Sequence, residues 1–96
     1  MKPSEALHAH RAAIRQVAAA HRTGNVRVFG SALQGTDTSN SDLDLLVDPS
    51  PETTLLDLGA IRHELRMLLG IRVDVITPQA LPDTLRASVL ATAMPV

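Results

Sequence analysis

Cysteine, tryptophan and tyrosine are all missing from this chain of 96 residues, and phenylalanine occurs only once. Without cysteine the chain can form neither a disulfide framework nor a thiolate metal site, and its composition suits a reducing compartment. The scarcity of aromatic side chains argues against nucleic-acid-binding modules that stack bases on aromatic platforms. It argues equally against a protein interface anchored by tryptophan and tyrosine.

Neither sign of charge is in excess. Lys and Arg number 9, Asp and Glu number 10, and the formal net charge is −1. The chain therefore lacks the strongly basic character of a duplex-binding domain, and we do not expect direct binding to nucleic acid. No apolar run approaches transmembrane length, and the N-terminal sequence MKPSEALHAHR lacks the apolar core of a signal peptide. We expect a cytoplasmic protein with no membrane association.

Glycine and proline divide the chain into alternating helical and extended segments. Their order predicts one α/β domain (α+β by some schemes) over residues 1–96, with helices packed on a small sheet. A sheet of three short strands has open edges, which leaves a homo-oligomer open. The expected helices are about 4–22, 54–70 and 83–93, with a short helical element from residue 77, and the expected strands are 26–29, 43–47 and 73–76.

Local signals mark where two of the helices begin. Ser4 is the expected N-cap of the first helix. Thr53 or Thr54 is the expected N-cap of the second, and Asp57 is placed to complete a capping box with Thr54. Residues 30–41 are rich in glycine, serine and threonine, which is typical of a turn-forming loop, with one helical turn at 31–34.

Two aspartates belong to one face of the second expected strand. Because side chains alternate along a strand, Asp42 and Asp44 point to one side while Leu43 and Leu45 point to the other. Their Cα atoms would lie roughly 6.5–7 Å apart at strand rise. Such a pair is usually just a solvated face, but its mutual repulsion is relieved by a cation, and hard oxygen ligands suit Mg²⁺ or Mn²⁺.

Two further features extend this pattern. Asp74 lies at the centre of the otherwise apolar third strand, so three carboxylates converge if the two strands are aligned neighbours. Gly30 and Ser31 follow the first strand, where glycine allows close backbone approach and the N–H groups of a helical turn can bind phosphate oxygens. Each feature alone is common in proteins, but their ordered combination favours a nucleoside triphosphate as ligand.

A family resemblance follows from these residues. The stretch FGSALQGTDTSNSDLDLLVD, followed by RVDVITPQAL, resembles the nucleotidyltransferase superfamily of the DNA polymerase β type. It is most similar to the minimal nucleotidyltransferase antitoxins, which pair with HEPN ribonuclease toxins, and the similarity extends over nearly the whole chain. The resemblance implies a nucleotidyltransferase fold, in which helices flank a small mixed sheet.

The resemblance also implies roles for five residues and a reaction. Gly30 and Ser31 would bind the triphosphate of ATP, and Asp42, Asp44 and Asp74 would be the catalytic residues that hold two Mg²⁺ ions. The implied reaction transfers AMP from ATP to a tyrosine of a cognate HEPN toxin and so neutralises the toxin. Because this chain has no tyrosine, a tyrosine acceptor must belong to another protein.

Two other functions stay open. Many relatives carry a basic residue shortly after Gly-Ser, where this chain has no charge up to and including Gln34, and that departure favours a non-catalytic antitoxin that acts by binding alone. Arg27 and Arg72 are the nearest candidates to supply the missing charge, although the sequence does not place them. The other alternative is a nucleotidyltransferase that acts on a small molecule or an RNA end.

Overall fold

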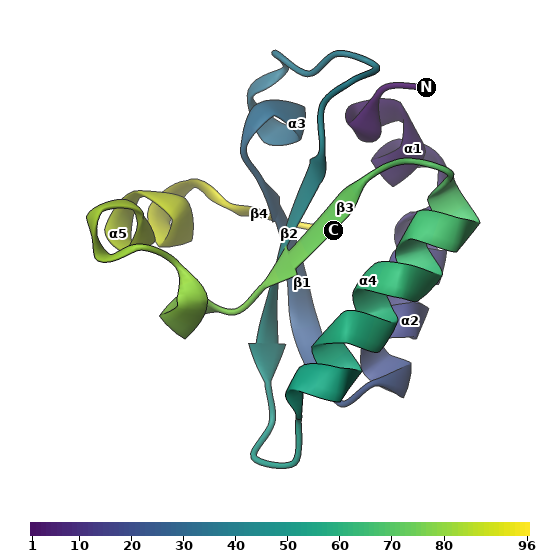
Figure 1. Ribbon diagram of the computed structural model, residues 1–96. Coiled ribbons are helices and arrows are strands. Elements are labelled where there is room, and N and C mark those ends of the chain that lie inside the picture. The colour runs from purple at the N-terminus through teal and green to yellow at the C-terminus, as the bar shows by residue number, and fades with distance from the viewer.

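The computed structural model describes residues 1–96 and shows a four-stranded sheet flanked by helices (Figure 1). The strand order is β3-β2-β1-β4, in which β2 pairs parallel with β3, and β1 pairs antiparallel with both β2 and β4. The sheet is therefore mixed, and the expected fold class is confirmed. The strands are β1 (Thr23–Phe29), β2 (Leu43–Pro49), β3 (Val73–Ile76) and β4 (Met94–Pro95).

Two of the helices, α2 and α4, lie side by side and cover one face of the sheet (Figure 1). Helix α2 packs on β1, and α4 packs on β3. None of the helices is both long enough and apolar enough to cross a membrane. The helices are α1 (Pro3–Ala9), α2 (Arg11–Ala20), α3 (Ser31–Gln34), α4 (Leu55–Leu69), α5 (Asp83–Thr92) and the 3₁₀ helix η1 (Pro78–Ala80).

The main core fills the space between these two helices and the sheet. Its fully buried side chains come from every layer, and each contributes roughly 1.5–3 kcal/mol through the burial of apolar surface. Because β2 is central in the sheet, its core-facing side chains are completely enclosed, which fixes the direction in which the alternate side chains of β2 point. Among the buried core residues are Ile14, Leu43, Leu45, Ile61, Leu65 and Val73.

Helix α4 begins and ends where the sequence predicts. Thr54 Oγ1 accepts a hydrogen bond of 3.3 Å from the backbone N–H of Asp57, and the backbone N–H of Thr54 donates to Asp57 Oδ2 at 2.9 Å. The helix ends at Gly70, which has a φ of +68°, a conformation that glycine adopts without a steric penalty. The capping box and the terminal glycine are both confirmed.

The opposite face of the sheet is only partly covered. Leu46 and Leu81 are buried there outside the main core cluster, and η1 packs on β2. Helix α5 contains no buried residue and packs chiefly against η1. Figure 1 shows α5 standing to one side of the strands, so much of this face, near the start of β2, stays open to solvent.

The structure differs from expectation in the first helix, in a fourth strand, and in the first two strands, which are longer than the expected 26–29 and 43–47. The prediction of one helix over 4–22 is wrong, because the helix breaks at His10 into α1 and α2, and its N-cap is Lys2 rather than Ser4. The backbone N–H of Ser4 instead donates a hydrogen bond of 2.8 Å to Asp37 Oδ2, a contact between distant segments that fixes α1 in place. Strand β4 was not predicted from the sequence, and it pairs with β1 through only two residues.

Candidate active site

The pleat of β2 places two carboxylates on the open face of the sheet. Asp42 immediately precedes the strand and Asp44 is its second residue, and both are partly exposed, whereas Leu43 and Leu45 are fully buried in the core. The burial of the alternate leucines therefore forces the two aspartates outward on the same side. The alternation predicted from the sequence is confirmed.

The third carboxylate lies on the neighbouring strand. In the parallel pairing of β2 with β3, Asp44 is the register partner of Asp74, as Leu43 is of Val73. Residues paired in this way point to the same face of a sheet, so the side chains of Asp44 and Asp74 are adjacent. The condition that the sequence left open, that the two strands be neighbours with aligned faces, is met.

The turn after β1 closes the other side of the site. Phe29, the last residue of β1, pairs with Asp44 across the antiparallel ladder, so Gly30 lies beside that carboxylate. Gly30 has a φ of +73°, and a Cβ atom at this position would lie 2.5 Å from Asp44 Oδ2. A side chain here would displace the Asp44 carboxylate and strain the backbone, whereas glycine lets the backbone pass directly against the carboxylate before α3 begins at Ser31.

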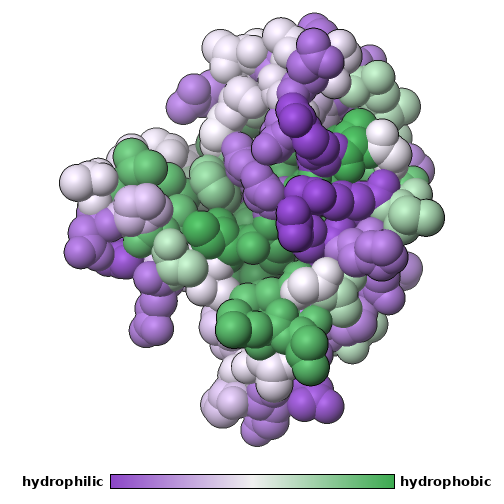
Figure 2. Space-filling model, in the orientation of Figure 1, coloured by the Kyte–Doolittle hydropathy of each residue, from purple (hydrophilic) through white to green (hydrophobic).

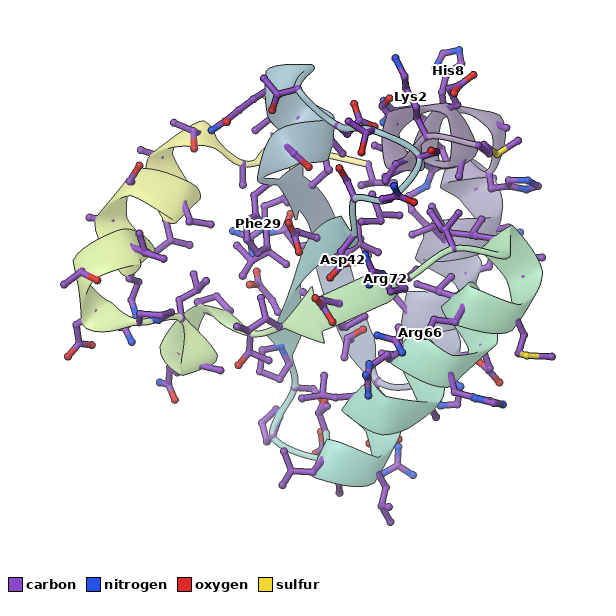
Figure 3. All side chains as sticks on the ribbon, turned by 45° about the horizontal axis from the view of Figure 1, so that its top comes forward. Lys2, His8, Phe29, Asp42, Arg66 and Arg72 are labelled. Carbon is purple, nitrogen blue, oxygen red and sulfur yellow. The ribbon has the colours of Figure 1, made fainter.

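Two arginines reach the same group of carboxylates. Arg72 Nε lies 2.8 Å from Asp42 Oδ1, and Arg66 Nη2 lies 3.6 Å from Asp74 Oδ1. Figure 3 shows the labelled side chains of Asp42, Arg72 and Arg66 following one another toward α4. Two of the three carboxylates thus have a cationic neighbour, and Asp44 has none.

The unpaired carboxylate is the one with the strongest electrostatic perturbation. Burial, together with the negative charges of Asp74 and Asp42, raises the pKa of Asp44 from 3.8 to about 6. A carboxylate with this environment holds its proton more tightly than an exposed aspartate, because nothing nearby stabilises its charged form. A bound cation would remove that cost.

The donor set fits a hard divalent cation, which is the metal that the resemblance implies. Asp42 Oδ1 is buried and accepts no hydrogen bond, although Arg72 Nε lies 2.8 Å away as an ion-pair partner. Carboxylate oxygens without hydrogen bonds, gathered in one like-charged group, are suitable ligands for Mg²⁺. With the side chains as they stand, however, no three acidic or histidine residues converge closely enough to enclose an ion.

Hydrogen bonds hold the loop between α3 and β2 in place directly before the site. Asp37 is buried, and its hydrogen bond from the backbone N–H of Ser4 holds the pKa of its carboxyl below the usual range. Nearby, the backbone N–H of Thr38 donates to Ser41 Oγ at 2.9 Å, which closes a turn directly before Asp42. These contacts set the point at which the chain enters β2.

An open cavity of about 630 Å³ adjoins the carboxylates on the side of β3. It lies between the turn before β2, the end of α4 and the first residue before β3. Both arginines of the site belong to its wall, and no acidic residue does. Its lining residues are Ser39, Asn40, Ser41, Arg66, Gly70, Ile71 and Arg72.

The structure decides between the two arginines that the sequence singled out. Arg27 pairs with Asp48 and with the backbone carbonyl of Asn25, away from Gly30, so it does not supply the missing charge. Arg72 does reach the site, but on the side of Asp42. The sequence did not single out Arg66 as a site residue, because a basic residue in the last turn of a helix is ordinarily explained by the helix dipole. The only available signal is its position seven residues before Val73, to whose carbonyl oxygen Arg66 Nε donates at 3.0 Å.

Comparison with known proteins gives consistent results. A family model described as nucleotidyltransferase domain matches residues 11–95. The protein adenylyltransferase MntA of Thermococcus cleftensis is 33% identical over 84 residues, which are 88% of this chain and 82% of that protein. A solved structure of a protein provisionally described as a minimal nucleotidyltransferase is 42% identical, with a TM-score of 0.86 over 97% of this chain and 95% of that one.

The fold also recurs in a more distant structure. A crystal structure of a toxin-antitoxin with AMP-PNP contains a chain that is 21% identical and superposes with a TM-score of 0.70. The match covers 83% of this chain and 66% of the other. At this level of identity the likeness concerns the fold.

Proposed function

The chain belongs to the nucleotidyltransferase domain family, and from this premise we propose that it is a protein adenylyltransferase, which transfers AMP from ATP to a hydroxyl group of a partner protein. The name of the relative from Thermococcus cleftensis supports this reaction. The shared fold of a toxin-antitoxin structure supports an antitoxin role, in which the acceptor belongs to the toxin. On the sequence resemblance, the toxin is a HEPN ribonuclease and the acceptor is one of its tyrosines.

One observation carries the proposal more than any other. Asp44 lies between Asp74, its partner across the parallel ladder, and Gly30, whose backbone approaches its carboxylate so closely that a Cβ would displace the carboxylate. A glycine turn that can bind phosphate is thereby placed directly beside a group of carboxylates. Phosphate and divalent cation are the two parts of a metal–nucleotide complex, and this site offers groups for both.

We assign the three carboxylates as the metal ligands. Asp42, Asp44 and Asp74 would hold two Mg²⁺ ions, and Asp42 and Asp44 would contribute to both. When bound, these ions supply charge neutralisation of the triphosphate and a lower pKa for the attacking hydroxyl. The residues of the chain provide the rest: the rigid strand pair fixes the separation of the carboxylates, and the core on the opposite face of β2 prevents them from turning away.

The reaction balances as a single displacement at phosphorus. The acceptor oxygen forms a bond to the α-phosphorus of ATP, and the bond from that phosphorus to the oxygen bridging to the β-phosphate breaks, which releases pyrophosphate. We assign Asp74 to take the proton of the acceptor hydroxyl, because it lies on the edge strand β3 with a side chain that is 51% exposed, so an acceptor from another protein can reach it. Gly30 and Ser31 hold the triphosphate through backbone N–H groups and the serine hydroxyl.

A tyrosine acceptor must come from outside this chain. The sequence has no tyrosine, and the fold has no second lobe that could enclose a small acceptor beside the carboxylates. The open face of the sheet therefore leaves room for a protein surface to dock there. Docking would supply the positioning that an enclosed pocket supplies in larger enzymes.

The test is labelling of the partner. The protein is incubated with ATP labelled in the α-phosphate, Mg²⁺ and the product of the neighbouring gene, and label is followed on each protein. Asp42→Asn and Asp44→Asn should each lower the labelling rate by at least about 100-fold, since each removes a proposed metal ligand. Asp83→Asn is the matched control, because Asp83 is exposed on α5 and pairs only with Arg86.

Each outcome has a distinct meaning. Labelling of the neighbour that is lost in Asp42→Asn and Asp44→Asn but kept in Asp83→Asn supports the proposal. Neutralisation of the toxin that survives the loss of both carboxylates shows instead that the antitoxin acts by binding alone. Label that appears only on RNA or on metabolites shows that the chain is a nucleotidyltransferase acting on an RNA end or a small molecule.

A further inference from the structure

The cavity beside β3 has the chemical character of an anion-binding site. Its wall carries the guanidinium groups of Arg66 and Arg72, with serine and asparagine side chains of the turn before β2. No carboxylate lines it. Figure 2 shows hydrophilic residues gathered over this part of the surface, in contrast to the apolar surface between α5 and the sheet.

Both arginines are held by the backbone with donors to spare. Arg66 Nε donates to the carbonyl oxygen of Val73 at 3.0 Å, and Arg72 Nη2 donates to the carbonyl oxygen of Asn40. These bonds fix the direction of each guanidinium, while the Nη1 groups of both donate no hydrogen bond within the protein. A guanidinium has five N–H donors in a fixed fork, and those left over match the two oxygens of a carboxylate or phosphate.

The cavity and the glycine turn lie on opposite sides of the carboxylates. Strand β2 stands between β1 and β3, so Gly30 at the end of β1 is on one side and Arg72, directly before β3, is on the other. In an in-line displacement, the attacking group and the leaving group lie on opposite sides of the phosphorus atom. With the triphosphate on the side of Gly30, the arginines are on the side from which the acceptor enters.

A cation bound by the carboxylates would take the present ion-pair partners of both arginines. Asp42 and Asp74 now share their charge with Arg72 and Arg66 at 2.8 and 3.6 Å. A divalent cation that takes these carboxylate oxygens leaves two guanidinium groups without a counter-ion. An anion in the cavity would then be favoured, because two neighbouring positive charges without a counter-ion repel each other.

We propose that Arg66 and Arg72 form an acceptor-side site that binds an acidic side chain of the partner protein and so positions the acceptor hydroxyl against Asp74. This rests on the proposed function in one respect, that the acceptor is a protein. Arg66 and Arg72 are positioning residues: they hold the acceptor segment and take no part in bond making.

Peptide binding tests the site without any transfer reaction. A short peptide with a central tyrosine flanked by glutamates is titrated into the isotope-labelled protein with Mg²⁺ alone, and its affinity is compared with that of the same peptide flanked by glutamines. The glutamate peptide should bind at least about fivefold more tightly, and it should move the Nε–H resonances of Arg66 and Arg72.

Substitutions then assign the effect to the two arginines. Arg72→Gln and Arg66→Gln should each weaken the glutamate peptide by about threefold to tenfold. Arg62→Gln should change it by less than about twofold; Arg62 lies one turn earlier on α4, is exposed and makes no ion pair. Arg72 is 65% exposed, so Arg72→Gln should preserve the fold even if Arg66→Gln does not.

Three results would overturn the inference. These are equal affinities for the two peptides, equal losses in Arg62→Gln and Arg72→Gln, or a loss of ATP affinity in Arg72→Gln that leaves peptide binding unchanged. The last would place the arginines on the donor side. If AMP transfer to the neighbouring gene product is observed and any of these results is also found, only this inference fails and the proposed function stands.

Discussion

Gly30 is the residue on which the geometry of the site depends most directly. Replacement by alanine would put a Cβ atom 2.5 Å from Asp44 Oδ2 in a backbone conformation, φ +73°, that disfavours any side chain. We expect Gly30→Ala to lower the free energy of unfolding by about 1–3 kcal/mol and the rate of AMP transfer by at least about tenfold. Thermal unfolding and the labelling assay measure the two effects.

Gly35 supplies the matched control for this substitution. It has a similar φ of +77°, but a Cβ atom there would meet nothing within 4 Å. Gly35→Ala should therefore cost about 1 kcal/mol from the backbone alone and leave transfer nearly unchanged. An equal loss of transfer in both variants would show that backbone strain, and not the contact with Asp44, accounts for the requirement.

Arg72 would compete with a bound metal ion for Asp42. Its guanidinium lies 2.8 Å from Asp42 Oδ1 and adds positive charge where a divalent cation would bind. We expect Arg72→Gln to tighten the binding of Mn²⁺, measured by electron paramagnetic resonance in place of Mg²⁺, by about threefold to tenfold. Arg62→Gln serves as the control for the loss of one positive charge. Weaker binding of Mn²⁺ in Arg72→Gln would show that the guanidinium supports the metal site instead.

At the scale of helices and strands, features set by local signals could be predicted from the sequence, and features set by long-range contacts could not. The limits of α4 follow from Thr54 and Gly70, because capping is decided within one turn of chain. The break at His10 carries no glycine or proline, and α1 is held by a hydrogen bond from Ser4 to Asp37, 33 residues away. Strand β4 likewise depends on its pairing with β1, to which no local pattern points.

Helix α5 buries no residue, and the side chain of Arg86 attaches it to the preceding segment by hydrogen bonds. Arg86 Nε donates to the carbonyl oxygen of Pro78 at 2.9 Å, and Nη2 donates to those of Gln79 and Leu81 at 3.1 and 2.7 Å. Since α5 buries no residue, these bonds provide much of its attachment to η1.

Removal of that side chain should free the helix without unfolding the protein. We expect Arg86→Ala to speed amide hydrogen exchange in α5 by about tenfold to 100-fold, because each lost hydrogen bond is worth about 1 kcal/mol. Exchange in α4 should stay within about twofold of the original protein, as it should throughout the chain in Arg62→Ala. Unchanged exchange in α5 would mean that its apolar contacts are sufficient.

At the scale of the whole molecule, the sheet brings together residues that are far apart in the sequence. Gly30, Asp44 and Asp74 come from three different strand ends, and the strand order places β2 between the other two. The residue types and their order along the chain predicted a phosphate turn and three carboxylates. The sequence could not predict that arginines from α4 and from the residue before β3 would neutralise two of those carboxylates, because that depends on side-chain directions in the folded state.

The charge of this site makes the stability of the metal-free protein depend on pH. The folded-state pKa of Asp44 is raised to about 6, above the ordinary value of 3.8, so its contribution to stability is complete below 3.8 and is lost as the pH rises through about 6. The pKa of Asp37 is lowered below 3.8, so its contribution to stability is complete above pH 3.8 and is lost as the pH falls through its lowered pKa. Between pH 4.5 and 7 the effect of Asp44 therefore prevails.

We expect the free energy of unfolding of the metal-free protein to fall by about 1–2 kcal/mol from pH 4.5 to pH 7, after allowance for solvent screening of this half-buried group. Thermal unfolding across this range measures it. Asp44→Asn, which cannot ionise, should remove most of that slope and should be the more stable protein at pH 7. Mg²⁺ should also flatten the slope in the original protein, because the cation stabilises the charged carboxylate, but it should have little effect on Asp44→Asn. A slope that persists unchanged in Asp44→Asn would assign the pH dependence to another group and remove the electrostatic argument for a cation at this carboxylate.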